Sequence, residues 1–334
     1  MNKSRNLQFT RFIAAVLVIF SHSFPLSEEN NSIEWMIYLT KGQSTFGSVA
    51  VALFFLCGGY LSVKLIQANT IRQAVIKRIN RIVPTLMFVT ILTIILGALI
   101  TSFSVQNYFK NFLTYKYLLN GVMILQHELP GVFSNAPYTR TVNGALWTLP
   151  LEMCCFIGVC ILNKLNLLKP KRIKYSLVGL LIISLSVFLL RNRYTKIETF
   201  IVPCIMYYEG TIYFIFKDKI KYNLKIIILS VCVLLGSIWA NCMMLGIVFV
   251  FPYIMVYFWF NTKQYFKKTY ILGNISYTMY LWGFPIQQYV GYKTNWEISA
   301  YENFVISIII DIFMGTMTHV FVEKNFRRKN EHNR

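Results

Sequence analysis

Acidic residues, and charged residues in general, are scarce in this sequence. Of the 334 residues, 14% are charged and only 13 are Asp or Glu, whereas 56% are apolar. A soluble domain usually has about a quarter of its residues charged. The composition therefore excludes an ordinary water-soluble domain and predicts an all-α membrane protein.

The spacing of the cysteines excludes further classes of site. All seven cysteines lie within or beside apolar stretches, and none forms the Cys-x-x-Cys or Cys/His patterns that bind metals. We therefore expect no metal site and interpret the cysteines as small core residues. The sequence also has no internal repeat and no soluble segment of domain size, so we expect one membrane-embedded domain over residues 1–334.

About ten apolar stretches are long enough to span a bilayer, whose apolar core of about 30 Å needs about 20 helical residues. The predicted architecture is therefore a polytopic bundle of about ten transmembrane helices. The expected spans are residues 7–26, 45–68, 82–104, 143–163, 175–191, 199–216, 226–241, 242–260, 270–290 and 301–321. The longest polar connection, about 105–142, is expected to be an external loop, with a re-entrant or interfacial helix at 115–125.

The net charge of +20 is concentrated in particular connections. If the N-terminus is cytoplasmic, most of the 33 basic residues fall in cytoplasmic segments, including residues 64–81, 164–174 and the basic tail 322–334. Basic residues accumulate on the cytoplasmic side of membrane proteins, so both termini are predicted to be cytoplasmic. We interpret the charge as topology in the cytoplasmic membrane, with anionic lipid as a partner and no nucleic acid.

Ionisable residues inside the predicted spans are few, and each is a candidate site because charge is costly in hydrocarbon. They are Arg11, His22, Glu152, Glu209, Asp311 and His319. Arg11 and His22 share one face of the first span, about 16 Å apart along its axis. They are either a snorkelling arginine and a packed histidine, or an anion-binding group and a general base in one cavity. We interpret Glu209, Asp311 and His319 as structural.

Two further features adjoin the predicted spans. Arg78 and Arg81 are neighbours on one helix face if the segment is helical, and two guanidinium groups there would bind a phosphate. The alternative is ordinary positive charge flanking a span. Glu152 follows a Leu-Trp-Thr-Leu-Pro segment in the fourth span, and such a carboxylate must be protonated or paired with a basic group.

These features, in this order, resemble the acyltransferase-3 family of integral membrane O-acyltransferases over nearly the whole chain. The matching motifs are Arg11 and His22 with ten residues between them, Phe54–Leu61, Arg78–Pro84, Asn143–Glu152, Leu272–Trp282 followed by Phe284–Ile286, and Glu323–Lys324. Two positions depart from the family pattern. Gly283 stands where many members have histidine, and Asn325 where many have proline, so a mechanism that needs two histidines is not expected here.

The resemblance implies transfer of an acyl group, most often acetyl, from cytoplasmic acyl-coenzyme A to a hydroxyl of a cell-surface or lipid-linked glycan. Acetyl-CoA would be the donor substrate, and no cofactor would be permanently bound. The donor phosphates would be held by three arginines, Arg11, Arg78 and Arg81. His22 would act as general base or as a transient acyl carrier, Glu152 would orient His22 or balance an arginine, and Trp147 would contact the sugar.

Two hypotheses from other classes stand beside this one. A transporter or flippase for a lipid-linked saccharide would also be a bundle with basic cavities, but many such proteins show internal repeats. A sensor or scaffold would have no use for Arg and His inside a span. No esterase-like soluble domain is recognised, so the membrane domain is expected to act alone, as a monomer or a homodimer.

Overall fold

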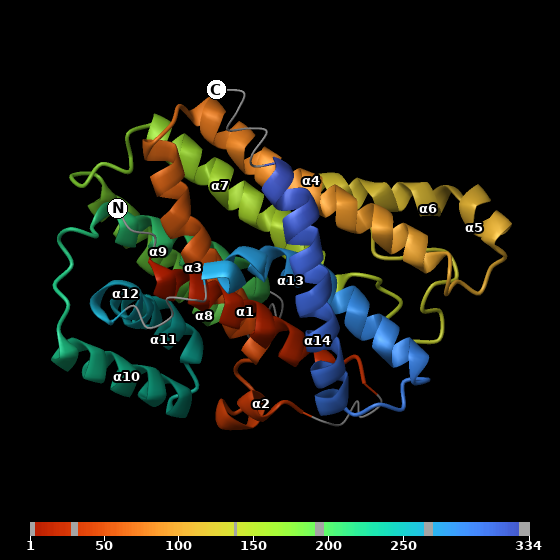
Figure 1. The fold of residues 1–334 in the computed structure, drawn as a ribbon. Coiled ribbons are helices and arrows are strands. Elements are labelled where there is room, and N and C mark those ends of the chain that lie inside the picture. Colours follow the sequence, from red (N-terminus) through yellow and green to blue (C-terminus); the bar gives the residue numbers. More distant parts are fainter. Residues whose placement is uncertain (1–3, 28–32, 137–138, 191–196, 264–269, 327–334) are drawn as a thin grey trace. The chain divides into compact units, whose positions relative to one another are not determined.

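The long helices of this chain cover the apolar stretches of its sequence, and Figure 1 shows the helical elements coloured along the chain. The computed structural model describes residues 4–27, 33–136, 139–190, 197–263 and 270–326, and every regular element within these ranges is helical. The α-helices are α1 (Arg5–Ser23), α2 (Trp35–Leu39), α3 (Phe46–Gln67), α4 (Ile71–Gly97), α5 (Val105–Lys110), α6 (Phe112–Lys116), α7 (Thr148–Lys164), α8 (Ile173–Leu190), α9 (Ile197–Ile215), α10 (Leu224–Trp239), α11 (Met243–Phe249), α12 (Phe251–Asn261), α13 (Tyr270–Lys293) and α14 (Ala300–Thr318). Shorter helical turns are η1 (Tyr117–Val122), η2 (Gly144–Trp147) and η3 (His319–Glu323). The all-α class is therefore confirmed for the described residues. Most of the predicted basic tail and residues 137–138 of the predicted loop lie outside the described residues.

Within the described residues, five helical stretches are long and apolar enough to cross a membrane. They are Phe46–Gln67, Ile71–Gly97, Gly144–Lys164, Met243–Asn261 and Ala300–Phe326. The remaining predicted spans also coincide with helices, namely α1, α8, α9, α10 and α13. The membrane character and the helical positions are thus confirmed, while the number of about ten spans and the side of the termini stay predictions.

Helix α4 begins at Ile71, well before the apolar stretch predicted from residue 82. Its first turn is closed by a reciprocal pair of hydrogen bonds. The Thr70 backbone N–H donates to the Gln73 side-chain oxygen at 3.1 Å, and the Gln73 N–H donates to the Thr70 hydroxyl at 3.3 Å. This pair is a capping box. The basic residues that follow are therefore helical, which places Arg78 and Arg81 on neighbouring positions of α4.

The segment predicted as one interfacial helix at 115–125 is instead divided among α6 and η1, preceded by α5. Figure 1 shows α5 and α6 beside the C-terminal part of α4. Tyr108 of α5 is completely buried, and its hydroxyl donates to the carbonyl of Ile94 on α4 at 2.9 Å. Burial raises the pKa of Tyr108, so the phenol stays protonated as the donor of this hydrogen bond. The short helices are thereby fixed to α4.

Two compact units are distinguished within the chain. The first unit comprises Met1–Ala14, Glu34–Ala74 and Leu151–Gly273, and the second comprises Ala15–Ile33, Val75–Pro150 and Asn274–Arg334. Helices α1, α4, α7 and α13 each run continuously from one unit into the other. The chain therefore links the units through helical backbone at each of these crossings.

In the first unit, α3 and α9 pack with their backbones in direct contact. A Cβ atom at Gly59 would overlap the carbonyl oxygen of Tyr207, and one at Gly210 would overlap the carbonyl oxygen of Leu56. The Tyr207 hydroxyl is also hydrogen-bonded to the hydroxyl of Ser62. Small residues permit such close approach of membrane helices. The association of α3 with α9 therefore depends on glycine on both helices.

In the second unit, buried amide groups hold α1 to α13 and the residues just after α1 to α14. The Nε2 of Gln287 donates to the carbonyl of Ile19 at 2.7 Å, and the Nδ2 of Asn303 donates to the carbonyl of Leu26 at 3.3 Å. Both amide side chains are completely buried. Hydrogen bonds in such apolar surroundings are costly to break. They therefore fix the C-terminal half of α1 against α13, and the residues that follow α1 against α14.

Candidate functional site

The segment that leads into α7, Thr139–Thr148, lies along one face of α13. The Tyr280 hydroxyl donates to the carbonyl of Ala145 at 2.7 Å and makes a 2.6 Å hydrogen bond with the Thr148 hydroxyl. One turn further on, the Phe284 ring lies against Gly144, where an added Cβ would come within 2.7 Å of the ring. The glycine therefore allows the backbone of this segment to lie directly on the aromatic ring.

The same segment is also held by amide groups. The Nδ2 of Asn143 donates to the carbonyl of Leu281 at 2.9 Å. The Nε2 of Gln288 donates to the carbonyls of Thr139 and Thr141 at 3.1 and 2.8 Å. Because this glutamine lies two turns beyond the tyrosine on the same face of α13, the segment and the helix run side by side in a fixed register.

His22 lies against the same face of α13. Its imidazole meets the Phe284 ring nearly edge to face, with ring centroids 5.1 Å apart and an interplanar angle of 78°. Among the described residues, no hydrogen bond holds the His22 side chain, so packing on Phe284 orients the imidazole. Three motifs far apart in the sequence, those of His22, Gly144 and Phe284, therefore meet at one aromatic ring.

Gly283, where a histidine was expected from the family pattern, lies against α1. A Cβ atom there would stand 2.7 Å from Cγ1 and 3.2 Å from Cδ1 of Ile19. Ile19 is buried, and its carbonyl accepts the hydrogen bond from Gln287, so the helix cannot easily move away. The glycine therefore lets α1, which carries His22, pack directly on α13.

We expect Gly283→Ala to lower the free energy of unfolding by about 1–3 kcal/mol, the usual cost of overpacking a close contact. Ile19→Ala removes the atoms that the new methyl group meets. The double variant should therefore lose less stability than the two single variants added together. Thermal unfolding in detergent, followed by tryptophan fluorescence, measures all four proteins. Strictly additive losses would contradict the contact.

Arg78 and Arg81 are half-buried on α4, which shares an apolar core with α13. The hydroxyl of Tyr277 on α13 donates to the carbonyl of Ile82, the residue after Arg81, at 3.1 Å. Tyr277 and Phe284 are two turns apart on α13, about 10 Å along the helix axis. The contact of α4 directly after Arg81 and the contact of His22 therefore lie about 10 Å apart along α13.

Arg11 and Glu152 both belong to the first unit. Both residues lie near Cys57 of α3. The carboxylate lies beside Gly58, where an added Cβ would stand 2.8 Å from the Glu152 Oε1. Both implied roles of Glu152, balancing an arginine and orienting His22, stay predictions.

Three residues of the site were not predicted as site residues. Phe284 was part of a matching motif but had no assigned role, and Gln287 and Gln288 were not among the candidates. Their signal was present in the spacing of Tyr280, Phe284 and Gln288, which recur every four residues and so share one helix face. Two amides inside an otherwise apolar span were a second signal. Trp147, the predicted sugar contact, is half-buried at the end of η2, directly after the segment bound to α13.

The other ionisable residues of the predicted spans have no described contact with this site. The Nδ1 of His319 lies 2.7 Å from the Oε2 of Glu323 one turn later, which fits the structural role predicted for it. Glu209 and Asp311 are buried, and within the described residues neither oxygen of Asp311 has a hydrogen-bond partner. Their carboxyl groups are expected to be neutral, because a bare charge there is very costly. In the described part of the chain, no three His, Cys, Asp or Glu side chains gather closely enough to hold a metal ion.

Comparison with known proteins adds an independent finding. The model of a family described as an acyltransferase domain matches residues 5–315. An O-acetyl transferase of Shigella phage Sf6 is 28% identical over 346 aligned residues, which cover 98% of this chain and 97% of the phage protein. No solved structure matches the chain.

Proposed function

Because this chain belongs to the acyltransferase-3 family, we propose that it is an O-acyltransferase of the cytoplasmic membrane, with about ten spans and both termini in the cytoplasm. The proposed donor is cytoplasmic acetyl-CoA, and the acceptor is a hydroxyl of a cell-surface or lipid-linked glycan. The name of the phage relative, an O-acetyl transferase, supports acetyl as the acyl group.

The observation that carries this proposal is that two parts of the chain contact α13 about 10 Å apart along its axis: His22 of α1 at Phe284, and α4, which carries Arg78 and Arg81, at Tyr277. Coenzyme A has phosphates at one end and the thioester at the other. Guanidinium groups bind phosphate through charge-assisted hydrogen bonds. A donor held by the arginine pair would therefore extend its thioester toward His22, and Arg11 on the same helix as His22 would add positive charge.

In the proposed reaction, His22 removes the proton from the acceptor hydroxyl while its oxygen attacks the thioester carbonyl carbon. The carbon–sulfur bond then breaks, and the leaving thiolate of coenzyme A takes the proton from the imidazolium. Both products leave with neutral His22 restored. In a second route the imidazole itself attacks first, forming an acyl-histidine that the sugar hydroxyl then cleaves. Trp147 would contact the sugar in either route.

The test of the proposal is transfer of label from radioactive acetyl-CoA to a glycan in native membranes that contain the protein. Mass spectrometry of the glycan should show a gain of one acetyl group per repeat unit. It would identify the sugar and the hydroxyl as well. Membranes that contain the protein and their natural glycans but transfer no label would overturn the proposal.

We expect Arg78→Ala and Arg81→Ala each to raise the KM for acetyl-CoA about tenfold or more, with little change in kcat. The reason is that a hydrogen bond to a charged group contributes about 1.5–3 kcal/mol, and 1.4 kcal/mol is a factor of ten. Initial rates at saturating acceptor measure this. Arg72→Ala is the matched control, because it removes the same charge from an exposed position of the same helix. An unchanged KM for acetyl-CoA in the two arginine variants would show that Arg78 and Arg81 do not bind the donor phosphates.

A further inference from the structure

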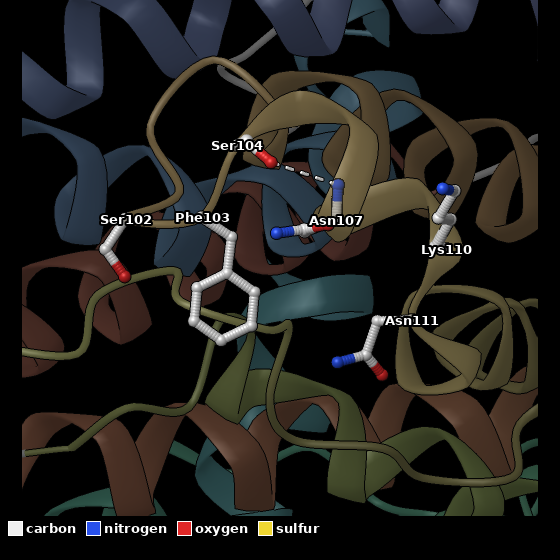
Figure 2. Close-up of a pocket in the computed structure, with 6 residues that line it drawn as sticks. All are labelled: Ser102, Phe103, Ser104, Asn107, Lys110 and Asn111. Atoms are coloured by element: carbon white, nitrogen blue, oxygen red, sulfur yellow. Dashed lines mark hydrogen bonds between the residues drawn. The ribbon is translucent and has the colours of Figure 1, made fainter.

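A pocket of about 530 Å³ lies on residues 102–111, which connect α4 to α6 (Figure 2). Its lining residues are Ser102, Phe103, Ser104, Asn107, Lys110 and Asn111. It belongs to the second unit, as does His22. On the proposed topology it faces the outside of the cell. Its volume falls in the range of about 300–1,000 Å³ that is typical of sites for small molecules.

The backbone beneath the pocket is rigid. Buried Tyr108 lies between the lining residues Asn107 and Lys110, and its carbonyl accepts a 2.6 Å hydrogen bond from the buried Thr114 hydroxyl. The N–H of Ser102 donates to the carbonyl of Gly131 at 2.9 Å. The exposed lining side chains are therefore presented by fixed backbone, so little ordering is needed when a ligand binds.

The lining combines one aromatic ring with hydroxyl and amide groups. Figure 2 shows the side chains of Phe103, Asn107 and Asn111 around the pocket, and the residue Phe103 is 46% exposed. The Asn111 Oδ1 accepts the N–H of Leu113 at 3.0 Å, which leaves its two amide protons for a ligand. The Ser104 hydroxyl oxygen accepts the N–H of Asn107 at 3.3 Å and still has a proton to donate.

This set of groups matches the chemistry of a sugar. A pyranose ring has hydroxyl groups around its rim, which amides and hydroxyls bind as both donors and acceptors. Its faces are C–H bonds, which pack on the electron-rich face of an aromatic ring such as Phe103. Lys110 is the charged residue of the lining, and no carboxylate is among the lining residues. The pocket therefore suits a neutral or anionic saccharide.

The pocket and the segment at His22 share one core. Tyr108 packs in the same apolar cluster as Val142, whose N–H donates to the carbonyl of His127 at 2.7 Å. Val142 immediately precedes Asn143, which is hydrogen-bonded to Leu281 of α13. The structure beneath the pocket therefore also supports the segment against which His22 and Phe284 lie.

We propose that the pocket at residues 102–111 binds the acceptor saccharide, at sugars beyond the one that receives the acyl group. This inference rests on the proposed function, and it identifies the substrate class as a neutral or anionic oligosaccharide. The residues that recognise the glycan are Phe103, Asn107 and Asn111.

The kinetic test compares the double variant Phe103→Ala/Asn107→Ala with Phe112→Ala/Asn135→Ala. The control removes the same residue types from exposed positions of the same connection, outside the pocket. The pocket variant should raise the KM for the labelled glycan about tenfold, with the KM for acetyl-CoA and the kcat unchanged, and the control should match wild type. If wild type transfers label and the pocket variant has the same glycan KM, the inference is wrong while the proposed function stands.

A binding test needs no acyl transfer. Saturation-transfer NMR on the full-length protein in detergent would use maltotriose, tri-N-acetylchitotriose and a hexuronate trisaccharide as probes. At least one should bind the wild type and the Phe112→Ala/Asn135→Ala control more strongly than the pocket variant, by about tenfold in Kd. Equal signals from all three proteins with every probe would show that the pocket does not bind a saccharide. The surface would then be interpreted as one that contacts lipid.

Discussion

His22→Ala is expected to reduce acyl transfer by about 10²–10⁴-fold while the protein still inserts and folds. A general base contributes about this much to a reaction, and a larger loss is expected if the imidazole carries the acyl group itself. The fold should tolerate the change, because among the described residues His22 makes a ring contact with Phe284 and no hydrogen bond. The measurement is label transfer from acetyl-CoA in membranes with matched protein levels.

His319→Ala is the matched control for this experiment. His319 also lies in a predicted span, but its imidazole is paired with Glu323 rather than packed at the site. Its loss should leave the transfer rate close to that of wild type. If His22→Ala transfers label as fast as wild type, His22 is not the general base. Label that stays on wild-type protein without acceptor, and is released by hydroxylamine, would select the acyl-histidine route.

Gly59→Ala is expected to prevent accumulation of folded protein. The added methyl group would occupy the position of the Tyr207 carbonyl oxygen on α9, and a backbone atom cannot rotate away as a side chain can. Overpacking usually costs about 1–3 kcal/mol, and this overlap with backbone should exceed that range. Since a whole protein is stable by only about 5–15 kcal/mol, much of its stability would be lost. The yield of monodisperse protein in size-exclusion chromatography measures the effect.

Two neighbouring comparisons separate this clash from a general effect of alanine. Gly236→Ala on α10 meets nothing within 4 Å, so it should be neutral or slightly stabilising. Gly58→Ala meets the end of the Glu152 side chain at 2.8 Å and the Tyr207 ring at 3.0 Å. It should fold with a modest loss of stability, because the carboxylate can turn away. If Gly59→Ala accumulates as well as Gly58→Ala, the close backbone approach is incorrect.

The positions of the helices were predictable because each apolar stretch has the length that a bilayer requires. The start of α4 was missed because residues 72–81 include four basic residues and were interpreted as flanking charge. The capping box of Thr70 and Gln73 was the available signal. Similarly, the segment at 115–125 has enough apolar residues for one helix, but its division into α6 and η1 depends on contacts with α4.

The candidate site was predictable in its residues but not in its geometry. A span makes an isolated histidine such as His22 conspicuous, because polar groups are costly there. Which ring it would meet depends on how α1 and α13 align, and a single sequence has no information on pairing between helices. The close fit at Gly283 could not be inferred either, since a missing histidine in a motif does not reveal which atoms replace it.

The attachment of the segment Thr139–Thr148 to α13 has a consequence for how related chains can differ in length. The backbone is bound to Gln288 at one end and to Tyr280 at the other, with Gly144 fixed on Phe284 between them. An inserted or deleted residue inside this segment would shift every later contact by one position. Insertions are instead expected before Thr139, where loop length can change without moving the chain on α13.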